Sequence, residues 1–121
     1  MNMKKASTLL VALFLFVTAI AQSTPDEKAK ALTDRMKTNL TLNDDQYKSV
    51  YDINLDFIKK LGGVKEDGGS KMAKFKKLKE IDKSRDASLQ KVLTEDQFKK
   101  FQTQKQETRE EMKEQYKKNK Q

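Results

Sequence analysis

The sequence lacks the side chains on which most catalytic and metal sites depend. It contains no cysteine, no histidine and no tryptophan among its 121 residues. Without cysteine there are no disulfides, so packing and hydrogen bonds have to hold the fold. Without histidine and cysteine the chain has neither the usual nucleophile–base pairs nor the preferred ligands of zinc. We therefore expect no catalytic residues, no metal site and no cofactor, and we expect that the protein is not an enzyme.

Proline and glycine are scarce, and where they occur they divide the chain. The only proline, Pro25, follows Thr24, which can cap the start of a helix. All four glycines lie between residues 62 and 69, which predicts a flexible Gly-rich linker over residues 62–70. The spacing of apolar residues elsewhere predicts four helices, at about 25–39, 44–61, 71–92 and 95–118. We therefore expect an all-α fold, with residues 22–121 forming one helical domain shaped as an elongated, bent hairpin.

The first 21 residues have the pattern of a removable signal peptide. Lys4 and Lys5 give a positive start, an apolar run follows from Leu9 to Ile20, and small residues surround the end at Ala21. The run is too short for an ordinary membrane-spanning helix. The sequence therefore predicts export, with a mature chain that begins at Gln22. The periplasm is the expected compartment, although a leader alone does not distinguish it from the medium.

Two short stretches, 51 positions apart, each carry the pattern of a helix start. In each, a short polar residue can accept a hydrogen bond from a first-turn N–H, and a glutamine three positions later can reach back, which makes a capping box. A leucine before the cap and an aromatic residue after the glutamine can clamp the incoming chain as a hydrophobic staple. We assign a structural role to the six motif residues Leu42, Asn43, Gln46, Leu93, Thr94 and Gln97.

The mature chain has little apolar material for a core of its own. Only 28 of its 100 residues are Ala, Val, Ile, Leu, Met, Phe or Tyr. A compact monomer of this composition is marginal, because small domains bury a limited share of their surface. We therefore predict that helices of two copies share a core in a homodimer.

Positive charge is concentrated in one segment. Residues 71–85 carry seven basic and two acidic residues, whereas residues 22–70 carry eight and nine. Such a segment can be a solvated face that only keeps the protein soluble, or a binding surface for acidic partners. As the binding surface we predict lysines for attraction and apolar residues for contact, namely Lys71, Lys74, Lys76, Lys77 and Lys79 with Tyr51, Phe57, Ile58, Met72 and Phe75.

The duplicated motif resembles the LTxxQ motif of the Spy/CpxP-like family of small periplasmic helical proteins. The stretch Leu93-Thr94-Glu95-Asp96-Gln97 matches in full, and the earlier copy has Asn43 where the family usually has threonine. The resemblance implies a dimeric cradle that acts as an ATP-independent chaperone and holds unfolded client proteins on a basic, partly apolar face. Some relatives are linked to metals, a role that the absence of histidine and cysteine does not favour here.

The resemblance and the charge also leave other functions open. CpxP-like relatives bind the external domain of a sensor kinase and restrain envelope-stress signalling, so a sensor kinase is a second possible partner. Binding to an anionic membrane surface is a third and less favoured alternative. We expect no nucleic-acid binding, because the aromatic residues are too few and too dispersed to form a base-stacking platform.

Overall fold

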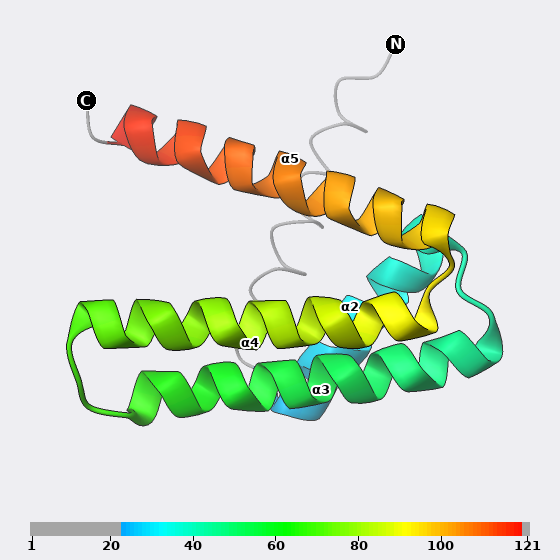
Figure 1. Ribbon diagram of the computed structural model, residues 1–121, viewed down its shortest axis with the longest axis horizontal. Coiled ribbons are helices and arrows are strands. Elements are labelled where there is room, and N and C mark those ends of the chain that lie inside the picture. Colours follow the sequence, from blue (N-terminus) through cyan, green and yellow to red (C-terminus); the bar gives the residue numbers. More distant parts are fainter. Residues whose placement is uncertain (1–22, 120–121) are drawn as a thin grey trace, which may run out of the picture.

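A computed structural model describes residues 23–119, which fold into four α-helices (Figure 1). These are α2 (Pro25–Leu40), α3 (Asp44–Glu66), α4 (Lys71–Val92) and α5 (Glu95–Asn119). The predicted all-α fold is confirmed. The predicted signal peptide, residues 1–21, lies outside the described part of the chain.

A long antiparallel hairpin of α3 and α4 is the centre of the arrangement (Figure 1). Helix α2 packs mainly on α3. Helix α5 turns back at the end of α4, and the two helices diverge toward the C-terminus (Figure 1). Both capping motifs lie at one end of the hairpin, which we call the motif end, and the α3–α4 connection forms the other, the tip.

Both predicted capping boxes are formed. Asn43 Oδ1 accepts from the Gln46 N–H at 2.8 Å, and Gln46 Oε1 accepts from the Asn43 N–H at 3.1 Å. In the second motif, Thr94 Oγ1 accepts from the Gln97 N–H at 3.2 Å, and Gln97 Oε1 accepts from the Thr94 N–H at 2.9 Å. Each box satisfies N–H groups that the first helical turn leaves without a partner.

The two motifs also bind each other, which the sequence pattern did not predict. The Gln46 and Gln97 amides exchange hydrogen bonds, at 2.7 Å from Gln46 Nε2 and 3.2 Å from Gln97 Nε2. Gln46 Nε2 also donates to the Val92 carbonyl at 3.2 Å, and Gln97 Nε2 to the Leu40 carbonyl at 3.1 Å. Each glutamine therefore caps its own helix and also satisfies the carbonyl at the end of another.

The hydrophobic core lies at the motif end. The staple leucines Leu42 and Leu93 are 5% and 7% exposed, and Val50 and Leu89 are fully buried. The complete buried cluster is Met36, Leu40, Leu42, Val50, Leu89, Leu93 and Phe101. Burial of such side chains contributes about 1.5–3 kcal/mol each, so this end supplies most of the packing energy.

A chain of polar groups crosses the helices beside this core. Buried Thr33 on α2 accepts from Asn54 Nδ2 on α3 at 3.0 Å, and Thr33 Oγ1 donates to the Ala29 carbonyl at 2.6 Å. Asn54 Oδ1 accepts from Arg85 Nε at 3.2 Å and from Arg85 Nη2 at 3.0 Å. These bonds fix the relative positions of α2, α3 and α4, because a buried polar group that loses its partner is costly.

Helix α5 is held to α4 by charges over its middle part. Lys105 Nζ lies 2.5 Å from Asp82 and 2.7 Å from Asp86, and Arg109 lies 3.1 Å from Asp82. Beyond this cluster, residues 106–119 are exposed. The far half of α5 therefore contributes no buried side chain to the described fold.

The prediction for the end of α3 was wrong. The helix does not stop at Leu61 but continues through Gly62 and Gly63 to Glu66, and the linker is Asp67–Ser70 rather than 62–70. A glycine in a helix interior costs about 1 kcal/mol relative to alanine. Pairing with α4 offsets this cost, since the added turn buries Val64, which is 7% exposed.

Candidate functional site

Large apolar side chains are exposed at the start of α4. Met72 is 65% exposed, Phe75 54% and Leu78 40%. Outward-facing apolar groups that gather on two helical turns are a common mark of a binding surface. The tip is therefore the strongest candidate for a functional site in the described part of the chain.

A groove between α3 and α4 adjoins these residues. Its volume is about 550 Å³, and its apolar wall consists of Ile58, Leu61, Val64 and Leu78. Around this wall lie three lysines from three different helices, Lys28, Lys65 and Lys74. None of these lysines forms an ion pair within residues 23–119. We call the groove together with Met72 and Phe75 the tip surface.

The charge of the tip surface has one sign. Residues 59–79 contain eight lysines, and the only acidic residues there are Glu66 and Asp67. Lys77 pairs with Asp67 at 3.2 Å, but both side chains are more than half exposed, and such surface pairs contribute little. The potential at the tip is therefore strongly positive and attracts acidic partners.

The structure brings most of the predicted binding residues to the tip. Ile58 and Lys74 line the groove. The Lys79 ammonium lies 4.9 Å from the centre of the Phe75 ring, so charge and apolar surface are in direct contact there. The remaining predicted residues on α4, Lys71, Met72, Lys76 and Lys77, are exposed on the same two to three turns.

Two predicted residues lie elsewhere. Tyr51 is half-buried and lies about two helical turns before Ile58 on a helix that rises about 1.5 Å per residue. Phe57 points to another pocket, where its ring packs 4.5 Å from the Arg85 guanidinium. The structure therefore does not join Tyr51 and Phe57 to the tip surface.

Sequence reasoning missed several groove residues. Leu61, Val64 and Lys65 continue the helical spacing of Ile58 across the glycines, and this spacing could have indicated a longer α3. Lys28 is contributed by α2 through tertiary packing. No local pattern could have placed it at the groove.

A family model matches residues 18–101. The chain belongs to the DUF4890 family, described as a domain of unknown function. The DUF4890 match includes both capping motifs, the hairpin and its tip, and ends at Phe101 near the start of α5. Its description names no activity, so the resemblance to Spy/CpxP-like proteins stays a prediction. The searches of curated proteins and of solved structures found no match.

Within residues 23–119, no helix is both long enough and apolar enough to span a bilayer.

Proposed function

We propose that this DUF4890 protein is an ATP-independent, holdase-type chaperone of the periplasm that binds unfolded or aggregation-prone proteins. The observation that supports the proposal most directly is the tip surface, where apolar side chains lie beside lysines from α2, α3 and α4. An unfolded protein differs from a folded one in exposing apolar groups, and many also carry acidic segments. Both features match the tip surface.

The lysines provide the capture step in this proposal. Attraction between opposite charges extends over about 10 Å at 0.1 M salt and raises association rates. Because eight lysines lie in residues 59–79, acidic clients are steered to the tip before any apolar contact forms. Capture therefore depends on ionic strength.

The apolar groups provide the holding step. Met72, Phe75 and the groove residues offer several small contacts over an open surface rather than one deep pocket. Each apolar contact contributes in proportion to the area it buries, about 25 cal/mol per Å². A client held by a few such contacts can leave by breaking them in turn, and no ATP is needed.

An aggregation assay tests the proposal. Reduced α-lactalbumin, an acidic client, is mixed with an equimolar amount of the protein at low salt, and light scattering is followed. We expect suppression at low salt that weakens at high salt. No suppression at low salt would overturn the chaperone proposal.

Two double variants separate the tip surface from exposed apolar surface in general. Met72→Ser with Phe75→Ser should reduce suppression strongly. Met112→Ser with Tyr116→Ser is the matched control, because Met112 and Tyr116 are 65% and 64% exposed and lie in a part of α5 with balanced charge. We expect the control to retain suppression, and equal losses in both variants would show that the tip has no special role.

The experiment also addresses the regulatory alternative and the predicted homodimer. A protein that captures one sensor-kinase domain and suppresses no aggregation would be a signalling partner rather than a chaperone. Homodimerisation stays a prediction from the thin core, and light scattering coupled to size-exclusion chromatography measures it directly.

A further inference from the structure

Arg85 is a largely buried cation that forms no ion pair within residues 23–119. It lies between α3 and α4, with its guanidinium carbon 4.5 Å from the centre of the Phe57 ring and 5.3 Å from that of Phe101. Burial lowers the pKa of this guanidinium, although the nearby Asp86 and Asp82 charges oppose the shift. A buried charge is costly unless it is paired, so the absence of a paired carboxylate needs an explanation.

The hydrogen bonds of Arg85 use only part of its donor set. Nε and Nη2 both donate to Asn54 Oδ1, at 3.2 and 3.0 Å, and Nη2 also lies 3.7 Å from Met36 Sδ. Within residues 23–119, Nη1 makes no hydrogen bond and no carboxylate lies within ion-pair distance. Asn54 supplies an amide oxygen, which carries no formal charge.

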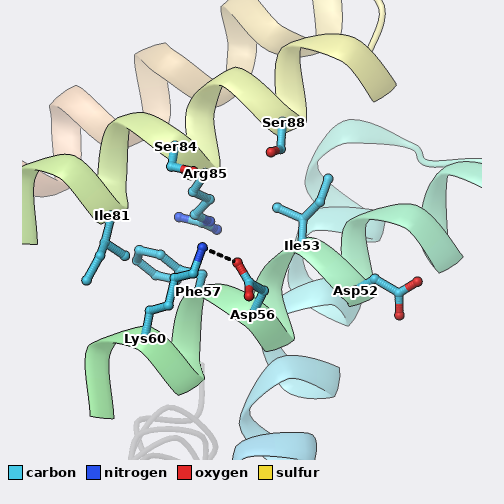
Figure 2. Close-up of a pocket in the computed structure, with 9 residues that line it drawn as sticks. All are labelled: Asp52, Ile53, Asp56, Phe57, Lys60, Ile81, Ser84, Arg85 and Ser88. Carbon is cyan, nitrogen blue, oxygen red and sulfur yellow. Dashed lines mark ion pairs between the residues drawn. The ribbon is translucent and has the colours of Figure 1, made fainter. Parts of the chain in front are cut away.

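A pocket of about 210 Å³ opens beside the guanidinium (Figure 2). Ser84 and Ser88 place hydroxyl groups along it, and neither hydroxyl has a hydrogen-bond partner in the part of the chain that the structure describes. Lys60 lies across the pocket from α4 (Figure 2). Ile53, Phe57 and Ile81 form the apolar part of the wall, and Asp52 and Asp56 also line the pocket.

Neither acidic residue of the pocket forms an ion pair with Arg85. The Asp56 carboxylate is 2.8 Å from Lys60 Nζ, so those two charges compensate each other. The Asp52 carboxylate points away from the guanidinium (Figure 2). The formal charges of the four charged lining residues balance, but the Arg85 guanidinium has no carboxylate within ion-pair distance in residues 23–119. It lies in a pocket that also has free hydroxyls and an apolar wall.

We propose that this pocket binds a carboxylate attached to a short apolar group. The carboxylate would accept from Arg85 Nη1 and from the Ser88 hydroxyl, and the apolar group would pack on Ile53, which lies on the same side of Arg85 as Ser88 (Figure 2). Charge-assisted hydrogen bonds of this kind are stronger than neutral ones. A free carboxylic acid and the C-terminus of a peptide that ends in an apolar residue offer the same chemistry. This site is separate from the tip surface and does not depend on the proposed chaperone function.

Titration with hexanoate, followed by NMR, tests the site. At constant ionic strength, hexanoate should shift the Arg85 Nε–H signal and the Phe57 ring signals saturably, with a Kd on the order of millimolar. Hexanol, which has the same apolar chain and no charge, should bind at least tenfold more weakly. The absence of a saturable shift with hexanoate would overturn the proposal.

Two variants make the test specific to the pocket. Arg85→Met should abolish the saturable shifts of the Phe57 ring. Because this variant removes bonds to Asn54 and can affect folding, Ser88→Leu is the second variant, which fills the pocket and leaves Arg85 in place. We expect Ser88→Leu to weaken hexanoate binding at least tenfold with an unchanged circular dichroism spectrum, and unchanged binding in this variant would contradict the assignment.

The source of the carboxylate is resolved by a second titration. A peptide that ends in leucine with a free C-terminus is compared with the same peptide carrying a C-terminal amide. Tighter binding of the free-acid peptide than of hexanoate would identify a chain end as the ligand. Binding of hexanoate alone would identify a free acid, and binding of the amidated peptide at equal strength would contradict carboxylate recognition.

Discussion

The two ends of the α3–α4 hairpin both carry large apolar residues but differ in how far these residues are covered. At the motif end, Leu89 and Val50 are fully buried, whereas at the tip Met72 and Phe75 are more than half exposed. The difference arises from the neighbours, because α2 and the start of α5 cover the motif end and only α2 reaches the tip groove, through Lys28. The fold therefore concentrates its stability at one end and leaves apolar surface open at the other.

The comparison is sharpest within α4, where two leucines lie on the same helix. Leu89 is 0% exposed in the core and Leu78 is 40% exposed at the groove. Leu89→Ala should lower the free energy of unfolding by about 3 kcal/mol. Leu78→Ala should lower it by about 0.5 kcal/mol, as for surface changes, and should weaken client binding. Urea denaturation measures both, and equal losses would contradict the proposed division of the hairpin.

The second prediction concerns the bonds between the motifs. Gln97→Ala removes the box bond from the Thr94 N–H and the bonds to Gln46 and the Leu40 carbonyl, but keeps the bond from its own backbone N–H to Thr94 Oγ1. We therefore expect a loss of about 2 kcal/mol. Thr94→Ala removes the cap alone and should cost about 1 kcal/mol. Thermal denaturation of the two variants measures the difference. Equal stabilities would show that the bonds between the motifs add nothing to capping.

The third prediction concerns the tip, where glycine has no structural need. A Cβ at Gly62 would meet nothing within 4 Å, and the residue is helical. Gly62→Ala should therefore raise the free energy of unfolding by about 0.4–1 kcal/mol, chiefly by restricting the unfolded chain. Gly69→Ala is the control, because its φ of 140° is strained for alanine, and this variant should be destabilised instead.

The smallest expected effect is at the surface of the motif end. The Tyr47 hydroxyl donates to Asp34 Oδ1 at 2.5 Å and, with Lys30, lowers the pKa of that carboxyl. Because the pKa of Asp34 is lower in the folded than in the unfolded chain, its ionised carboxylate stabilises the fold at pH values above the ordinary pKa of 3.8. This stabilisation is lost as the pH falls through the folded-state pKa. Tyr47→Phe should therefore lower the Tm slightly at pH 7 and by less at pH 2. A loss of equal size at both pH values would exclude this contact.

The sequence predicted the helices well because their starts are encoded locally. Thr24, Asn43, Ser70 and Thr94 all accept from the first turn of their helix, as expected from their side chains. The predicted end of α3 was wrong because the packing of Val64 stabilises the longer helix by more than the helix-breaking preference of Gly62 destabilises it. Local preference therefore fixed the starts, and tertiary packing fixed this end.

The candidate site was predicted in part, and the reason is geometric. The lysines and apolar residues of α4 are neighbours in sequence, so their proximity follows from one helix. The groove combines residues of α2, α3 and α4. The placement of Arg85 opposite Asn54 and Phe57 likewise depends on how α3 packs on α4. Contacts of this kind follow from the arrangement of whole helices, which a single sequence does not specify.

Hydrogen exchange in the presence of client tests the central claim most directly. Amide exchange is measured for the protein alone and with reduced α-lactalbumin at low salt, and peptides from the two ends of the hairpin are compared. Client should slow exchange over residues 58–78 and leave residues 42–50 and 89–101 unchanged. Slower exchange confined to the motif end, or no change at the tip while aggregation is suppressed, would contradict the account.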